Sequence, residues 1–280
     1  MTVGPEPRVA VIIPCYNDGA VVGEALASLQ EDEPLEVVIV DDASTDLATR
    51  EVLAELEAAG TRVVRHEVNQ HLSAARNTGL ASTSARYVYP LDADDQAVPG
   101  VLAKMADRLD AVPGAAVVAG DYDEFGSQDL RRAVPPFLDP FRIAYINEYP
   151  VTAMFRRTAL EELGGWRRIR GYEDWDLWMA LAERGSRMEH LGEGNPIYRR
   201  RLHGTRMLNE VKSRHRAAYL ELRSAHPRLF AEIRRHRRAS PMPLHRKLLY
   251  PYVYGARPRT KWERHVKQWL DDHGVWTLRG

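Results

Sequence analysis

The stretch RVAVIIP, residues 8–14, is an apolar run rich in β-branched residues that ends at a proline. Because it lacks polar alternation, it predicts a strand buried on both faces. Outward from it, LEVVIV at 35–40, RVVR at 62–65 and RYVYP at 86–90 repeat the pattern, and apolar residues at helical spacing fill the intervals. Strands alternating with helices in this way predict an α/β fold, with a mixed, mostly parallel sheet flanked by helices.

The rest of the chain divides into two parts. We expect residues 1–205 to form the large α/β domain and residues 206–280 a basic, mainly helical C-terminal extension. Segment 123–150 is rich in proline and aromatic residues and lacks periodicity, so it is predicted to be a long functional loop. In the extension, LLYPYVY at 248–254 is expected to interrupt the helical pattern.

Composition excludes several classes of protein. The chain has 280 residues, 44% of them hydrophobic, so it can bury a large core. Its only cysteine, Cys15, rules out a disulfide within the chain and argues against a cysteine-based zinc site. No apolar run is long enough to span a bilayer and no signal peptide is visible, so we expect a cytoplasmic protein.

Charge is distributed unevenly along the chain. Residues 196–280 contain 21 Lys and Arg against 6 Asp and Glu, whereas residues 1–195 contain 18 against 33. The basic part either faces an anionic partner or pairs with the acidic part of the chain, and both alternatives stay open. We expect no nucleic-acid partner.

Polar residues follow three of the predicted strands, in the segments 16–18, 41–42 and 92–95. Because ligands of parallel sheets bind outside the carboxyl ends of the strands, these segments should line one crevice. Asp92 and Asp94 lie at i and i+2 and can converge on a hard cation such as Mg²⁺ or Mn²⁺; the alternative is a plain acidic turn. Asp41 and Asp42 can accept hydrogen bonds from a ribose or a uracil N–H; the alternative is a helix cap.

Asp46 is expected to cap the next helix, which would leave Asp41 and Asp42 spare. Glu173 and Asp174 open another predicted helix, where the macrodipole favours ionised carboxylates and where one of them can act as a general base. Simple capping is the alternative. Trp166, Trp175 and Trp178 are more often core residues than sugar platforms, although one exposed indole face beside a carboxylate would suit a carbohydrate.

Six motifs in order resemble those of family 2 glycosyltransferases with the GT-A fold, over about residues 8–205. They are VIIPCYN at 11–17, VDDASTD at 40–46, SAARNTGL at 73–80, LDADD at 91–95, GGW at 164–166 and EDWDLW at 173–178.

The resemblance implies a nucleotide-sugar donor, most often a UDP-sugar, and a divalent Mn²⁺ or Mg²⁺ cofactor. The acceptor is unknown. Its hydroxyl would attack the anomeric carbon in a single displacement that inverts the configuration there. Asp94 would be the principal metal ligand, Asp174 the catalytic base with Glu173 next to it, and Arg76 would lie beside Asp42. The remaining implied residues are Pro14, Tyr16, Asn17, Asp41, Asp42, Arg76, Asp92 and Ala93 for the donor, His203 for the metal and diphosphate, and Gly164, Gly165, Trp166 and Trp175 for the sugars.

Other functions fit less well. A sugar nucleotidyltransferase needs a glycine-rich N-terminal loop, and residues 14–19 hold a single glycine. A dinucleotide-binding protein is disfavoured because no G-x-G-x-x-G is present. A non-catalytic nucleotide-sugar-binding protein would not need intact carboxylates at Asp92, Asp94 and Asp174. A glycosidase uses paired carboxylates but does not need the residues on the nucleotide side.

The C-terminal part suggests peripheral contact with the inner face of a membrane. Basic residues at 234–238 and 245–247 precede the tyrosines of 250–254, and both kinds of side chain suit an anionic interface. The alternatives are that the arginines pair with the acidic domain or bind an anionic soluble acceptor, and that the tyrosines are core residues.

Overall fold

A seven-stranded sheet forms the centre of the computed structural model, which describes residues 6–127, 129–169, 171–202 and 215–254. Its strand order is β10-β6-β9-β4-β1-β2-β3, and only β9 runs antiparallel to its neighbours. The strands are β1 (Val9–Cys15), β2 (Leu35–Asp41), β3 (Arg62–Arg65), β4 (Tyr87–Pro90), β6 (Ala115–Ala119), β9 (Met154–Arg156) and β10 (Arg187–His190). The predicted fold class is confirmed.

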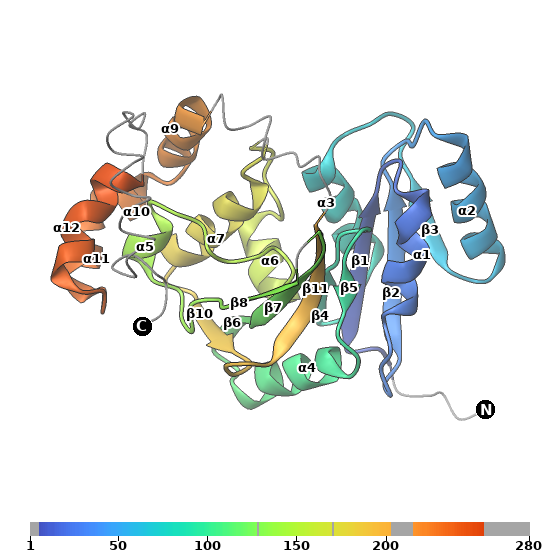
Figure 1. Cartoon of the computed structure of the whole chain (residues 1–280), viewed down its shortest axis with the longest axis horizontal. Helices are drawn as coiled ribbons and strands as arrows, with labels where there is room; N and C mark the ends of the chain where they lie inside the picture. The colour runs from blue at the N-terminus through green and yellow to red at the C-terminus, as the bar shows by residue number, and fades with distance from the viewer. Residues whose placement is uncertain (1–5, 128, 170, 203–214, 255–280) are drawn as a thin grey trace.

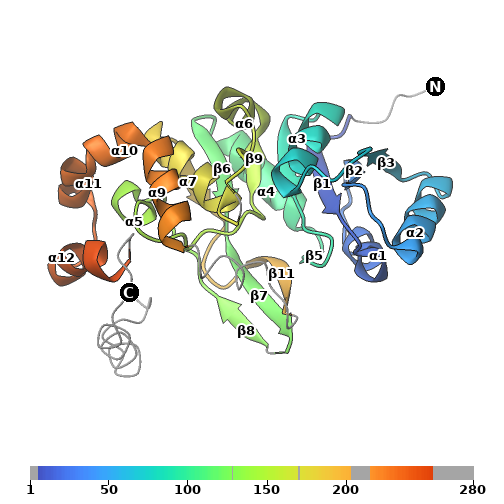
Figure 2. The same ribbon diagram turned by 90° about the horizontal axis from the view of Figure 1, so that it is seen from above.

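Helices cover both faces of this sheet (Figures 1 and 2). The helices of the described residues are α1 (Gly19–Ala27), α2 (Leu47–Ala58), α3 (Leu72–Ser82), α4 (Val101–Ala111), α5 (Pro140–Ile143), α6 (Arg157–Leu163), α7 (Glu173–Glu183), α9 (His215–Ala225), α10 (Pro227–Ala231), α11 (Ile233–Ala239) and α12 (Leu244–Val253). Of these, α1, α2 and α4 lie on one face of the sheet and α3, α6 and α7 on the other. Among the described residues no helix is both long and apolar enough to cross a membrane.

The central strand β1 shows why the apolar runs are continuous. Val11 and Ile13 pack with α1, α2 and α4, whereas Ile12 points to the other face and packs with α3, α6 and α7. Successive residues of a strand face opposite sides, so a strand covered on both faces needs apolar side chains at every position.

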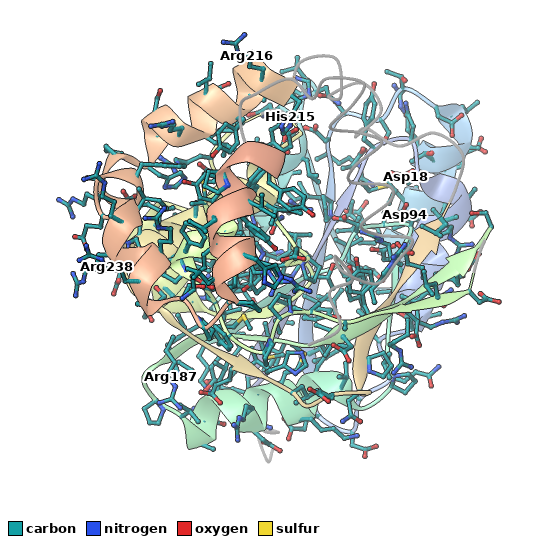
Figure 3. The ribbon with its side chains drawn as sticks, turned by 60° about the vertical axis from the view of Figure 1, so that its left-hand side comes forward. Asp18, Asp94, Arg187, His215, Arg216 and Arg238 are labelled. Atoms are coloured by element: carbon teal, nitrogen blue, oxygen red, sulfur yellow. The ribbon has the colours of Figure 1, made fainter. Side chains whose placement is uncertain are left out.

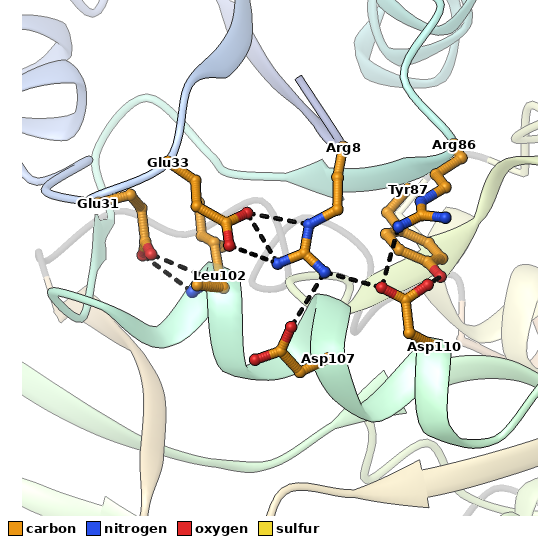
Figure 4. Close-up of polar contacts among 9 residues, drawn as sticks. Arg8, Glu31, Glu33, Arg86, Tyr87, Leu102, Asp107 and Asp110 are labelled. Carbon is orange, nitrogen blue, oxygen red and sulfur yellow. Dashed lines mark hydrogen bonds and ion pairs between the residues drawn. The ribbon is translucent and has the colours of Figure 1, made fainter. Parts of the chain in front are cut away.

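A charged network closes the end of the sheet where β1 begins (Figure 4). The Arg8 guanidinium lies 2.6 Å from Glu33, 2.9 Å from Asp107 and 2.7 Å from Asp110. Glu31 accepts hydrogen bonds from two backbone N–H groups in the first turn of α4. These contacts tie α4 to the N-terminal ends of the parallel strands, opposite the edge where their carboxyl ends meet.

Segment 123–150 is not the long loop that was predicted. A second sheet, of order β5-β11-β7-β8, contains β7 (Asp121–Gly126) and β8 (Leu130–Arg132) as a hairpin, together with β5 (Gln96–Ala97) and β11 (Pro196–Leu202). The hairpin carries cross-strand ion pairs between Arg131 and Asp123 and between Arg132 and Glu124. Only β8 lies at the edge of this sheet, because β7 also pairs with β11. Both strands are rich in charged residues and lack the apolar alternation on which the prediction relied.

The C-terminal helices pack on the α/β part. Tyr219, Leu222 and Leu229 from α9 and α10 belong to the same buried cluster as Trp175 of α7. The predicted interruption at 248–254 is wrong, because α12 continues to Val253 with Pro251 inside its last turn. A proline this close to a helix end removes little of the hydrogen-bond ladder. For residues 260–272 the sequence predicts a last helix, and these residues lie outside the described part of the chain.

Candidate active site

The carboxyl ends of β1, β2 and β4 meet at one edge of the large sheet. Backbone hydrogen bonds continue past the strands there: the Asp42 N–H donates to the Cys15 carbonyl at 2.9 Å, and the Leu91 N–H donates to the Ile12 carbonyl at 3.0 Å. The polar segments after these strands are therefore neighbours in space, as the parallel arrangement predicted.

Arg76 joins two candidate residues across this edge. It extends from α3, its side chain is completely buried, and it donates to Asp174 Oδ1 at 2.9 Å and to Asp92 Oδ1 at 2.8 Å. The two carboxylate side chains remain 39% and 34% exposed. The buried guanidinium thus lies behind two carboxylates that solvent can reach.

The environment of Asp174 suits a proton acceptor. The surrounding protein removes part of the hydration of the Asp174 carboxylate and raises its pKa to about 6, with the charges of Asp92 and Glu173 adding to the rise and Arg76 working against it. Burial acts to lower the pKa of Arg76, but Asp92 and Asp174 more than offset it and hold that pKa above its ordinary value. Asp174 is therefore ionised at neutral pH, yet basic enough to accept a proton.

The turn after β4 concentrates negative charge. Asp95 is buried, and its pKa is raised well above the usual range by that burial and by the charges of Asp92 and Asp94. Arg201, from β11, fastens the turn: its N–H donates to Asp95 Oδ1 at 2.9 Å and its Nε donates to the Asp94 carbonyl at 3.0 Å. β11 thus fixes the turn through Arg201, while the side chains of Asp92 and Asp94 stay partly exposed.

The expected donor residues have several environments. Tyr16 is 43% exposed just beyond β1, whereas Pro14 and Ala93 are buried. The Asn17 side chain accepts hydrogen bonds from the N–H groups of Thr45 and Asp46, and so fixes the loop after β2.

Asp46 caps α2, as predicted, by accepting from the Thr49 N–H at 2.9 Å. Asp41 and Asp42 are nevertheless not spare. Asp41 accepts from the Ser44 N–H, and the Asp42 carboxylate, which is 4% exposed, accepts from the N–H groups of Gln70 and His71. Both carboxylates therefore organise loops at the strand ends.

His66 completes the surroundings of Asp42. Its Nδ1 lies 2.6 Å from Asp42 Oδ1 and its Nε2 lies 2.8 Å from Thr78 Oγ1, so it links the strand end to α3. The structure brings Arg76 to Asp92 and Asp174 rather than to Asp42, beside which it was expected. The hydrogen bonds of Asp42 come instead from the segment leading into α3.

The Gly164-Gly165-Trp166 segment lies against α3. Asn77 accepts from the Trp166 N–H and donates to its carbonyl, both at 2.8 Å, and a Cβ on Gly165 would lie 2.2 Å from Asn77 Oδ1. Trp166, Trp175 and Trp178 are 2%, 5% and 0% exposed. No indole face of these three residues is offered to a sugar in this structure, and their core role is the one observed.

Two residues of the site were not anticipated, and one expected residue cannot be placed. His66 and Arg201 carry contacts to the candidate residues, and the run Arg199-Arg200-Arg201 ahead of His203 was a visible signal for the second. His203 itself lies outside the described residues, so its proximity to Asp94 stays a prediction.

Comparisons with known proteins agree with this arrangement. The sequence profile of Glycosyl transferase family 2 matches residues 10–164. The putative glycosyltransferase EpsE of Bacillus subtilis is 31% identical over 202 residues, which cover 67% of this chain and 71% of EpsE.

Two solved structures share the fold. S. aureus TarS 1–349 in complex with UDP-GlcNAc aligns with a TM-score of 0.62 at 19% identity, over 88% of this chain and 79% of that one. The mannosyltransferase PcManGT from Pyrobaculum calidifontis, in complex with GDP-Man and Mn²⁺, aligns with a TM-score of 0.59 at 21% identity, over 98% and 82%. The predicted GT-A fold is confirmed.

Proposed function

Because this chain belongs to glycosyl transferase family 2, we propose that it is a metal-dependent, inverting enzyme that moves a sugar from a UDP-sugar to an acceptor hydroxyl. The observation that carries the proposal is the bridge from Asp92 through the buried Arg76 to Asp174. It places the accessible Asp174 carboxylate, with a pKa of about 6, beside Asp92 at the carboxyl ends of the parallel strands, where the donor is expected to bind.

Asp174 is the base in this proposal. The acceptor hydroxyl oxygen forms a bond to the anomeric carbon while the bond from that carbon to the diphosphate oxygen breaks. The hydroxyl proton passes to the Asp174 carboxylate, and the electron pair of the broken bond leaves with the diphosphate. Arg76 orients Asp174 through one hydrogen bond and favours its ionised form. A single displacement from the opposite face inverts the anomeric centre.

The residues after β4 fit a divalent metal. Among the residues that the structure describes, no cluster of three or more His, Cys, Asp or Glu side chains is arranged to hold an ion by itself. A set of one or two carboxylates completed by phosphate oxygens is nevertheless typical for Mg²⁺ and Mn²⁺. The raised pKa of Asp95 reflects, besides burial, the negative charge of Asp92 and Asp94, which a cation would offset.

We assign Asp94 as the main metal ligand, with His203 joining it. When bound, the ion would supply Lewis-acid stabilisation of the charge that develops on the diphosphate. The exposed ring of Tyr16 is assigned to the nucleobase, and Asp92 to the ribose. UDP is favoured as the carrier because UDP and UDP-GlcNAc are bound in TarS structures, although the GDP-Man of PcManGT makes guanosine the competing base.

A thermal-shift panel tests the donor and the metal together. A ligand that binds only the native state raises the melting temperature, by an amount that grows with its concentration over Kd. We expect UDP and one UDP-sugar to raise it in the presence of Mn²⁺, and EDTA to abolish the shift.

Asp94→Ala should remove the metal-dependent part of the shift, whereas Glu55→Ala, an exposed carboxylate on α2, should not change it. If a GDP-sugar raises the melting temperature more than any UDP-sugar does, the nucleobase of the donor is guanine rather than uracil. A rise in melting temperature that EDTA does not change would contradict the metal site.

A further inference from the structure

The last two described helices, α11 and α12, lie on one side of the molecule. They occupy the end opposite to α2 and β3 in both views (Figures 1 and 2). This end belongs to the basic part of the chain, and no step of the proposed reaction uses it.

The inner faces of both helices are anchored in a small core. Tyr250 of α12 is 3% exposed and stacks on Phe141 of α5, with the ring centroids 6.5 Å apart. Ile233 of α11 and Met242 pack against the same cluster. The expectation that the tyrosines of 250–254 reach a membrane is therefore wrong for Tyr250, and the opposite faces of the two helices are turned outward.

The outward face of α12 is apolar. Leu244, Leu248 and Leu249 are 71%, 50% and 40% exposed. At 3.6 residues per turn they lie on one side of the helix, away from Tyr250, and His245 lies between them. Three of the nine large apolar side chains that are exposed in the described ranges thus belong to one helix of ten residues, which makes them a patch rather than scattered surface residues.

The outward face of α11 is cationic. Arg234, Arg235, Arg237 and Arg238 are exposed, and Figure 3 shows Arg238 pointing away from the molecule. Three of these arginines, Arg234, Arg235 and Arg238, lie together with Glu232 around a shallow, open stretch of surface over α10 and α11. Glu232 is the only acidic residue between positions 226 and 254, against seven Lys and Arg.

We propose that this surface docks the enzyme on an anionic lipid membrane. The docking face, as we define it, consists of Arg234, Arg235, Arg238, Leu244, Leu248 and Leu249. The leucines would enter the boundary between headgroups and acyl chains while the arginines contact lipid phosphates. An apolar helix face combined with nearby cations is the pattern of helices that lie in a membrane interface. The excess of arginine over the single acidic residue Glu232 suits the negative charge of an anionic lipid surface.

Vesicle sedimentation of the full chain tests the docking. The probes are vesicles of phosphatidylcholine alone and of phosphatidylcholine with about one-third phosphatidylglycerol. The wild-type protein should sediment with the anionic vesicles at low salt and not with the neutral ones, and added salt should weaken binding because exposed charges are screened. The assay needs no turnover, so its failure is separate from a failure of the proposed transferase chemistry.

Two double variants locate the surface. Arg234→Gln with Arg238→Gln should lower the partition coefficient roughly 30-fold, since each arginine near an anionic surface contributes about fivefold. Leu244→Ser with Leu248→Ser should lower it by at least about tenfold. Matched controls at other places in the fold are Leu47→Ser, a leucine 66% exposed on α2, and Lys104→Gln on α4, and both should bind as the wild type does.

The proposal is overturned if the wild-type protein stays in solution with anionic vesicles at low salt, or if both double variants bind like the controls. Light scattering tests whether a second copy of the chain binds this face instead. If the wild-type protein is a dimer and the leucine variant is a monomer, the face is a dimer interface and the membrane proposal is overturned. Should the leucine variant melt early, the arginine variant alone decides, because exposed arginines can be replaced with little effect on folding.

Discussion

Replacing Arg76 by methionine removes the positive charge that lies between Asp92 and Asp174. An opposite charge within about 4–6 Å lowers the pKa of a carboxyl group by roughly 1–3 units, and Arg76 lies 2.9 Å from Asp174. Without it, the pKa of Asp174 should rise from about 6 to roughly 7–9. At pH 7 the ionised fraction of the base would then fall roughly twofold to a hundredfold.

The assay is the pH dependence of UDP release from the UDP-sugar that the thermal-shift panel selects. The wild-type rate should rise with pH through about 6, because Asp174 accepts a proton only when it is ionised. In Arg76→Met the midpoint should move up, and much of the rate lost at pH 7 should return at higher pH. Arg76→Lys keeps the charge but not the two-pronged contact, so its midpoint should move less.

A lower plateau with an unchanged midpoint would refute this reasoning. It would mean that Arg76 acts only on the donor or on folding, and that Asp174 does not set the pH dependence. Because the Arg76 side chain is completely buried and its replacement can also disturb folding, the melting temperature of each variant must be measured first. The lysine variant keeps the test usable if the methionine variant unfolds.

Further expectations concern the support of the site. Gly165→Ala should lower the free energy of unfolding, measured in urea, by about 2–4 kcal/mol, because Gly165 has a φ of 77° and a Cβ would overlap Asn77. The control is Gly23→Ala on α1, where a Cβ meets no atom. It should raise the free energy of unfolding by up to about 1 kcal/mol. A neutral Gly165→Ala would show that the loop moves freely. His203→Ala should raise the Mn²⁺ concentration needed for half-maximal UDP binding, and an unchanged requirement would remove this residue from the metal site.

The parallel core could be predicted because its strands are buried on both faces. Runs such as RVAVIIP and LEVVIV leave little choice of structure, and the polar residues at their ends follow from the topology. The hairpin β7–β8 was missed because its charged strands, held by pairs such as Arg132 with Glu124, have no apolar periodicity.

The site was harder to predict than the fold because side-chain partners depend on tertiary packing. The motif around Arg76 singled out this residue, but only the position of α3 shows that it lies between Asp92 and Asp174. In the same way, the sequence marked Asp42 as polar and well placed, but the loop that uses its carboxylate, residues 66–71, comes from a different part of the chain.

The central claim is that Asp174 removes the proton of the attacking hydroxyl, and kcat of Asp174→Asn tests it most directly. The amide keeps the shape of the side chain but accepts no proton, so with Mn²⁺ present UDP release should slow by about 10²–10⁴ in kcat while the affinity for UDP stays unchanged. An unimpaired kcat in this folded variant would contradict the account and move the base elsewhere, to Glu173 first.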